Sequence, residues 1–263
     1  MARIHPTASI EDGAVLGADV VIGPFCVIGG EVELKDGVVL RSHVVITGKT
    51  SIGEGSKVYS FASLGEPGQI YKNEGEPGRL EIGRGCELRE YVTVNCGSPK
   101  GDLVTRIGED CMLMVGAHVA HDCQIGKGVI FANNATLGGH VTIGDKVFLG
   151  GLSAVHQFVE IGEHAIIGGM TGVEGHVIPF GRVTGDRATL DGLNIIGLER
   201  RGFDRATIRR LDVAFKQLFH GEGTFAERLV SVAQEHGDEP NVQRIVGFIQ
   251  GVDRRRPLTQ VAR

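Results

Sequence analysis

Aliphatic residues recur at every sixth position along most of the first 173 residues. A first series has 11 consecutive members, and a second begins at Ile107 after one extra residue shifts the phase. Four residues after each aliphatic position the residue is nearly always small or β-branched, and glycine often follows the aliphatic residue directly. This hexapeptide period is typical of a parallel β-helix. The two series are Ile4, Ile10, Leu16, Ile22, Ile28, Leu34, Leu40, Ile46, Ile52, Val58 and Leu64, then Ile107, Leu113, Val119, Ile125, Phe131, Leu137, Ile143, Leu149, Val155, Ile161, Ile167 and Val173.

The period also predicts which residues lie side by side. Three short strands of six residues make a coil of 18 residues, so residues 18 apart are expected to stack on neighbouring coils at the strand spacing of about 4.8 Å. Two segments, 65–81 and 96–106, interrupt the pattern and are predicted to be loops that project from the prism. Such loops on a rigid scaffold often carry functional residues.

A helical pattern replaces the repeat near the C-terminus. Asp204 is a candidate N-cap for a helix with apolar residues on one face, "TFAE" (224–227) is a capping box for a second helix, and a third is expected over about 241–250. The segment 176–194 is interpreted as a closing coil and linker. We therefore predict a mainly β protein with two domains, a β-helix over 1–187 and a small α-helical domain over 188–263.

Composition narrows the functional class. The chain has 41% apolar and 22% charged residues and no apolar run of the roughly 18 residues needed to span a bilayer, so neither disorder nor membrane integration is expected. Five cysteines without a CxxC pair argue against a disulfide framework or zinc ribbon and favour a reducing, cytoplasmic setting. Residues 200–263 carry 12 Lys and Arg against 8 Asp and Glu, within a net charge of −5, which suggests an anionic ligand near this part rather than nucleic acid.

The stretch "GAHVAHDCQIG" (116–126) holds three polar residues, His118, His121 and Asp122, that belong to neither the aliphatic nor the small series. We expect them to point outward or into a groove between subunits. The stacking rule places Gly139 beside His121 and His140 beside Asp122. His156 and Gln157 follow on the next coil.

This group suits acyl transfer. A neutral histidine beside a carboxylate is held in one tautomer and can act as a general base. A glycine one coil away can offer its backbone N–H to a developing oxyanion. Because the chain has no GxSxG elbow, direct attack by an acceptor hydroxyl or amine is favoured over a covalent intermediate.

Two other functions remain open on the residues alone. One is a zinc enzyme of the gamma-carbonic-anhydrase type, for which His140 and His176 imitate two ligands two coils apart, although Gly181 stands where a third would be wanted. The other is a non-catalytic β-helix scaffold with surface histidines.

Seven motifs along the chain resemble those of one family, the UDP-N-acetylglucosamine acyltransferases. They are "IHPTA" (4–8), "IGPFC" (22–26), "GEPGR" (75–79), "AHVAHDC" (117–123), "FANNATLGGHV" (131–141), "AVHQF" (154–158) and "GLERRGF" (197–203). The resemblance implies a left-handed coil, a homotrimer with active sites at the subunit interfaces, and no metal or cofactor. It also implies transfer of an (R)-3-hydroxyacyl chain from acyl carrier protein to the 3-position of UDP-N-acetylglucosamine, the first step of lipid A biosynthesis in the cytoplasm of Gram-negative bacteria.

The same resemblance assigns roles to residues. His121 is expected to be the general base, Asp122 its orienting partner and Gly139 the oxyanion donor, with acyl carrier protein and nucleotide contacts in the C-terminal domain. Gly169 is expected to limit the acyl chain length. The remaining substrate-binding residues would be Lys72, His118, His140, His156 and Gln157 in the cleft, and Asn194, Arg200 and Arg201 at the nucleotide and its phosphates.

Two positions depart from the family pattern. Ile70 stands two residues before Lys72 where an acidic residue is usual, and Ile196 replaces another acid near Asn194. The first departure leaves the acceptor open. Both the 3-hydroxyl sugar and its 3-amino analogue remain candidates.

Overall fold

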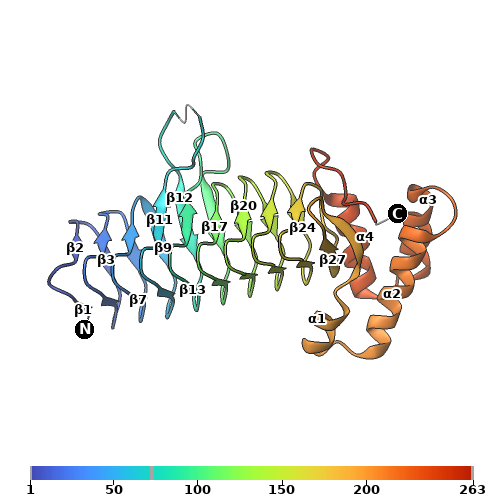
Figure 1. Ribbon diagram of the computed structural model, residues 1–263, viewed down its shortest axis with the longest axis horizontal. Helices are drawn as coiled ribbons and strands as arrows, with labels where there is room; N and C mark the ends of the chain where they lie inside the picture. Colours follow the sequence, from blue (N-terminus) through green and yellow to red (C-terminus); the bar gives the residue numbers. More distant parts are fainter. Residues whose placement is uncertain (1, 72–73, 262–263) are drawn as a thin grey trace.

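Three parallel sheets wind into a triangular prism in the computed structural model, which describes residues 2–71 and 74–261 (Figure 1). Consecutive strands belong to different sheets, and each strand pairs with the strand one coil away. The fold is the expected left-handed parallel β-helix, followed by four helices.

The strands of each sheet are very short, most of them two residues long. Sheet A contains β1 (Arg3–Ile4), β4 (Val21–Ile22), β7 (Val39–Leu40), β10 (Lys57–Val58), β13 (Glu87–Leu88), β16 (Met112–Leu113), β19 (Ile130–Phe131), β22 (Phe148–Leu149), β25 (Ile166–Ile167), β27 (Gly181–Thr184) and β28 (Thr189–Leu193). Sheet B contains β2 (Ser9–Ile10), β5 (Val27–Ile28), β8 (Val45–Ile46), β11 (Ser63–Glu66), β14 (Thr93–Asn95), β17 (His118–Val119), β20 (Thr136–Leu137), β23 (Ala154–Val155) and β26 (Gly172–Val173). Sheet C contains β3 (Val15–Leu16), β6 (Glu33–Leu34), β9 (Lys49–Ile52), β12 (Arg79–Ile82), β15 (Val104–Ile107), β18 (Gln124–Ile125), β21 (Thr142–Ile143) and β24 (Glu160–Ile161).

The strand register confirms the stacking rule. His118 pairs with Thr136, and Thr136 with Ala154, each 18 residues on. The rule fails only where a loop lengthens a coil, as between Ser63 and Thr93 and between Thr93 and His118. Both predicted loops project from the prism, between β11 and β12 and between β14 and β15 (Figure 1).

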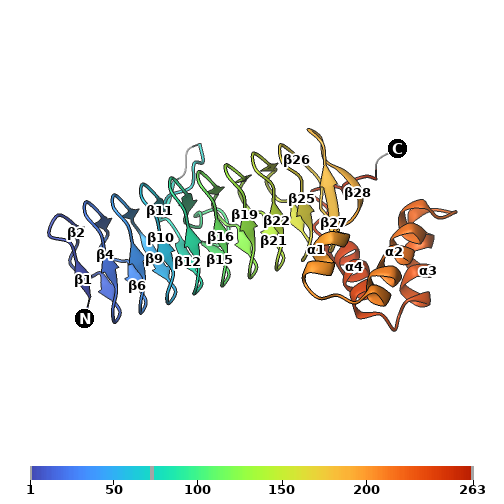
Figure 2. The same cartoon turned by 60° about the horizontal axis from the view of Figure 1, so that its bottom comes forward.

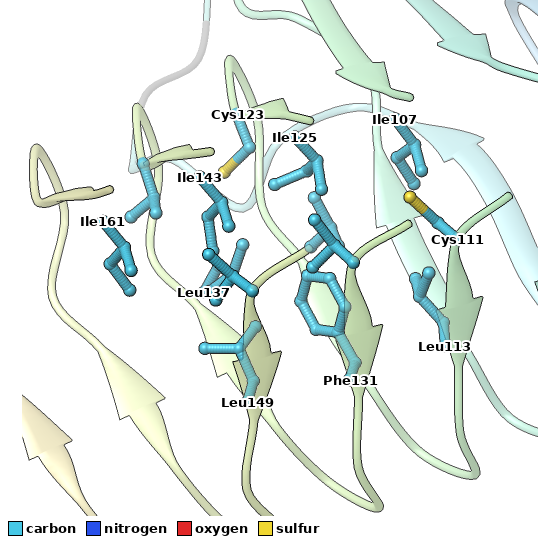
Figure 3. Packing of buried hydrophobic residues seen from close by; sticks show 14 of the residues in the cluster. Ile107, Cys111, Leu113, Cys123, Ile125, Phe131, Leu137, Ile143, Leu149 and Ile161 are labelled. Atoms are coloured by element: carbon cyan, nitrogen blue, oxygen red, sulfur yellow. The ribbon is translucent and has the colours of Figure 1, made fainter. Parts of the chain in front are cut away.

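The aliphatic series forms the core. Its members fill the interior coil after coil, and Phe131 and Leu149 are completely buried (Figure 3). The first coil differs, since Ile4 is 46% exposed and Ile10 and Leu16 are half-buried. These three residues lie at the open end of the prism, where no preceding coil covers them. All five cysteines are buried free thiols, and four of them occupy the small series as predicted: Cys26, Cys86, Cys111 and Cys123.

The corners of the prism demand an unusual backbone. Sixteen described residues other than glycine adopt a positive φ, including Asp122 and His140 at about 60°. The left-handed region is costly for most residues but is tolerated best by Asn, Asp and His. Polar residues at these corners are therefore compatible with the coil, and they point away from its core.

The C-terminal part closes the prism and then leaves it (Figure 2). Strand β27 adds to sheet A beside β25, and β28 returns antiparallel to it, so the segment interpreted as a linker is a hairpin. The predicted division at 187/188 falls in the turn of this hairpin. The helices are α1 (Ile195–Arg200), which the pattern did not reveal, and the three predicted ones, α2 (Arg205–His220), α3 (Phe225–Glu235) and α4 (Pro240–Gly251).

The chain then folds back over the last coils. His176 bridges to Leu258 and Leu190 to Val261, so residues 252–261, here called the C-terminal strap, lie against the β-helix. Among the described helices, none has the length and apolar character needed to cross a membrane.

The N-cap of α2 gives a test of the helical domain. The Asp204 carboxylate accepts a hydrogen bond from the Thr207 backbone N–H at 2.8 Å. Asp204→Ala is expected to lower the free energy of unfolding by about 1 kcal/mol, because a backbone donor loses its partner. Asp212→Ala, which removes only an exposed pair with Lys216 on the same helix, is the control and should cost about 0.5 kcal/mol or less. Equal effects in denaturant titrations would contradict the capping role.

Candidate active site

His121 and Asp122 occupy the corner between β17 and β18. The Asp122 side chain is fully buried, and its carboxylate accepts hydrogen bonds from the Ser98 backbone N–H at 3.1 Å and from the Ser98 hydroxyl at 2.6 Å. Its own backbone N–H donates to the Thr105 hydroxyl at 2.8 Å. Ser98 belongs to the second loop, so this loop anchors the carboxylate.

The two side chains form a directed pair. His121 Nδ1 lies 2.7 Å from Asp122 Oδ2. Burial alone would raise the pKa of Asp122, but the hydrogen bonds from His121 and Ser98 outweigh it and hold that pKa below its usual value. An ionised Asp122 accepts the proton of Nδ1, which leaves the lone pair of Nε2 available as a base.

Gly139 lies against the imidazole, as the stacking rule predicted. A β-carbon at this position would stand 2.4 Å from His121 Cε1 and 2.6 Å from Nε2, so this approach requires glycine. On another side, a β-carbon at Gly68 in the first loop would meet the His121 ring at 2.9 Å. The imidazole is thus fixed between two glycines. The Gly139 N–H donates to no acceptor among the described residues and remains available beside Nε2.

His140 extends the site by one coil. Its ring meets that of His121 edge-on, with centroids 5.1 Å apart, and its Nε2 lies 3.8 Å from Asp122 Oδ2. On its other face it stacks on Phe158 at 4.7 Å, and the Arg255 guanidinium of the C-terminal strap covers Phe158 at 4.2 Å. Burial lowers the pKa of His140, against the opposing effect of the Asp122 carboxylate, which favours a neutral ring.

His118 lies on the same coil as His121. Its Nδ1 is 2.7 Å from the Thr93 hydroxyl of the preceding coil. Burial, with a smaller effect of the His121 ring, lowers the pKa of His118. His118 is thus a neutral, oriented polar group beside the general-base candidate.

His156 and Gln157 lie one coil beyond Gly139 and His140 and are exposed. The Arg256 guanidinium of the C-terminal strap contacts the His156 ring and donates from Nε to the Gln157 carbonyl at 3.1 Å. The strap thus reaches the rim of the site.

The predicted nucleotide residues line a different cavity. Asn194, Arg200 and Arg201 border a pocket of 860 Å³ between sheet A and the helices, together with Arg182 from β27. Asn194 caps α1 by accepting from the Gly197 N–H at 3.1 Å. Burial lowers the pKa of Arg201, which forms no ion pair with any carboxylate in the described part of the chain.

The structure therefore brings some predicted residues together and leaves others apart. His118, His121, Asp122, Gly139 and His140 form one group, with His156 and Gln157 at its rim. Gly169 lies at the corner between sheets A and B, where a β-carbon would be 3.4 Å from the Gly151 carbonyl oxygen. Lys72 lies outside the described residues, and the pocket of Asn194, Arg200 and Arg201 lies on sheet A, opposite the corner of His121.

Several contacts were missed by the sequence reasoning. Ser98 and Gly68 lie in the two loops that interrupt the repeat, and those interruptions were the available signal. Arg255 and Arg256 carried a weaker signal, as part of the basic C-terminal segment.

One group in the described chain has three metal-ligand atoms within 4.8 Å of one another: His121, Asp122 and His140. The 2.7 Å between His121 Nδ1 and Asp122 Oδ2 matches a shared proton. A tetrahedral zinc bound to both atoms would hold them about 3.3 Å apart. His176 is engaged elsewhere, since its Nδ1 accepts from the Glu160 N–H at 2.9 Å and its Nε2 lies 2.6 Å from the Asp253 carbonyl oxygen.

A hexapeptide β-helix bearing a His–Asp pair and an adjacent backbone donor defines a hexapeptide-repeat acyltransferase. Residues 13–48 and 105–139 match the family described as bacterial transferase hexapeptide (six repeats). Residues 176–258 match the one described as UDP N-acetylglucosamine O-acyltransferase, domain 2. The chain belongs to the UDP-N-acetylglucosamine O-acyltransferase family.

Full-length relatives support this assignment. The acyl-[acyl-carrier-protein]–UDP-N-acetylglucosamine O-acyltransferase of Azorhizobium caulinodans is 51% identical over 97% of this chain and 94% of its own length. The UDP-N-acetylglucosamine acyltransferase from Campylobacter jejuni superposes with a TM-score of 0.92 at 38% identity, covering 99% of this chain and 100% of its own. LpxA from Acinetobacter baumannii gives a TM-score of 0.94 at 37% identity, covering 98% and 99%.

Proposed function

We propose that this acyltransferase moves an (R)-3-hydroxyacyl chain from acyl carrier protein to the 3-position of UDP-N-acetylglucosamine, the first step of lipid A biosynthesis. The observation that carries the proposal is the His121–Asp122 pair with Gly139 against the imidazole. The names of the full-length relatives supply the donor and the acceptor. A buried, oriented base beside a free N–H is more than a scaffold needs, which disfavours the non-catalytic alternative.

The geometry supports a direct transfer. His121 Nε2 takes the proton of the attacking hydroxyl as its oxygen bonds to the thioester carbon. Asp122 stabilises the imidazolium, and the Gly139 N–H faces the developing oxyanion. The carbon–sulfur bond then breaks, the imidazolium returns its proton to the thiolate, and the ester and the free carrier thiol leave. No cofactor takes part in this sequence.

A homotrimer with shared active sites would unite the residues that one chain separates. The corner of His121 joins sheets B and C, whereas the pocket of Asn194 and Arg201 lies on sheet A, across the prism. Two neighbouring copies can bring these surfaces together. An apolar ridge along the corner between sheets A and B, beside Gly169, is available for such packing. It consists of Phe25, Phe61, Tyr91, Leu152 and Met170, all exposed.

In this arrangement Asn194, Arg200 and Arg201 bind the nucleotide and its phosphates, and Lys72, His118, His140, His156 and Gln157 line the cleft. Gly169 limits the acyl chain length. The basic C-terminal domain meets the acyl carrier protein. We place the reaction in the cytoplasm, which suits the five free cysteines.

The acceptor atom is the first property to test. One acyl carrier protein substrate is offered with two acceptors, UDP-N-acetylglucosamine and its 3-amino analogue, and products are identified by mass spectrometry. We expect the ester to form with the higher kcat/KM, in line with the O-acyltransferase names of the relatives. Preference for the amine would instead assign N-acylation, consistent with Ile70 and Ile196. Acylation of neither sugar would overturn the proposed function.

A further inference from the structure

His164 lies at the corner between β24 and β25, in an aromatic setting that fixes its ring. The residue is 6% exposed. Phe180 stacks on the imidazole with centroids 5.7 Å apart, and Phe203 meets it edge-on at 5.2 Å. Its backbone N–H donates to the Asp145 carbonyl of the preceding coil at 2.8 Å. Neither the backbone nor the ring of His164 has freedom to reorient.

This fixed residue contacts two residues of the nucleotide pocket. The Asn194 side-chain amide donates to the His164 carbonyl at 2.9 Å, and Arg201 Nη1 lies 3.4 Å from His164 Nδ1. The other arm of the guanidinium, Nη2, donates to the Lys146 carbonyl at 2.5 Å. Arg201 is therefore held at both nitrogens by groups of the β-helix, while its charge stays without a carboxylate partner among the described residues.

The chemistry of the contact determines the tautomer. A guanidinium has donors and no acceptor, so Nδ1 must offer its lone pair and the ring proton must sit on Nε2. Burial, followed by the nearby cations Arg201, Lys146 and Arg244, lowers the pKa of His164 to about 4. The ring is then neutral at physiological pH, which the hydrogen bond requires.

We propose that His164 is a positioning residue for substrate binding: through its Nδ1 it aims Arg201 into the 860 Å³ pocket, where the guanidinium meets the diphosphate of the UDP-sugar. This inference rests on the proposed function and adds a residue to it. The anchored guanidinium is preorganised, so less conformational entropy is lost when the diphosphate binds. Phe180 and Phe203 serve the same end by holding the imidazole.

A pair of substitutions separates the acceptor from the ring. His164→Phe keeps an aromatic ring between Phe180 and Phe203 but removes the acceptor. His164→Asn gives up the ring but places an amide oxygen near the position of Nδ1. We expect H164F to raise KM for UDP-N-acetylglucosamine about tenfold, the scale of a lost hydrogen bond to a charged group. Its kcat and its KM for the acyl donor should stay within about twofold, and H164N should recover most of the nucleotide KM.

The double variant H164F/R201A completes the test. If His164 acts through Arg201, H164F has no further effect on the nucleotide KM once Arg201→Ala has removed the guanidinium. A wild-type KM in H164F, an equal rise in H164F and H164N, or independent effects in the double variant would each overturn the proposal. Calorimetric titration of wild type with UDP-N-acetylglucosamine and with UDP identifies the other failure. Absence of binding there would sink the proposed function together with this inference, whereas normal binding with an unaffected H164F sinks the inference alone.

Discussion

His121→Ala is expected to lower kcat for acyl transfer by about 10²-fold or more, the scale of a lost general base. Nε2 would take the proton of the attacking hydroxyl, and no other described side chain combines a buried carboxylate partner with an adjacent free N–H. The KM values should change little, because the ring is held by Asp122, Gly68 and Gly139 for proton transfer rather than for binding. Steady-state kinetics with both substrates measures the effect.

Controls separate chemistry from folding. His5→Ala removes an exposed histidine at the first coil and should leave kcat unchanged. Asp122→Asn should lower kcat in the same direction but less, by about tenfold, since the amide keeps a Ser98 contact and loses the charge that stabilises the imidazolium. H121A should elute at the wild-type size in gel filtration. Near-normal turnover in a folded H121A variant would remove His121 from the proposed mechanism.

Periodicity predicted the scaffold because a β-helix repeats one local rule. Each coil needs an aliphatic residue inside and a small residue near the corner, so the core could be enumerated from the sequence. The same rule predicted that Gly139 lies beside His121 and His140 beside Asp122, since both pairs are 18 residues apart. The rule has no term for an open end, which is why Ile4 is exposed although it belongs to the series.

What broke the period could not be predicted in detail. The loop that contains Ser98 leaves the prism and returns to the Asp122 carboxylate 24 residues away, a contact that no spacing encodes. The strap behaves in the same way, since Arg256 reaches Gln157 across 99 residues of sequence. Such contacts depend on how an irregular segment packs in three dimensions. The hydrogen bond between Arg201 and His164 likewise joins a helix to a coil with no shared repeat.

Gly139→Ala is expected to abolish most activity although it removes no functional group. The added methyl carbon would stand 2.4 Å from His121 Cε1, far inside van der Waals contact, and the ring cannot yield toward Gly68, where a β-carbon would already be 2.9 Å away. The imidazole must tilt, and a displacement of about 1 Å in a catalytic group costs about 10²-fold in rate. Gly29→Ala is the matched control, because a β-carbon there meets its nearest atom at 3.4 Å. We expect wild-type kcat for that variant.

The double variant H121A/G139A shows which property of Gly139 matters. Alanine retains the backbone N–H, so the oxyanion donor survives the G139A substitution and any loss arises from the displaced imidazole. Once His121 is replaced by alanine, the methyl group at position 139 has no ring to displace, and the second substitution should cost little more. Additive losses would mean instead that the methyl group blocks the acyl chain or shifts the N–H. In that case the close approach of Gly139 would serve the thioester, and the orientation of His121 would depend on Asp122 and Gly68 alone.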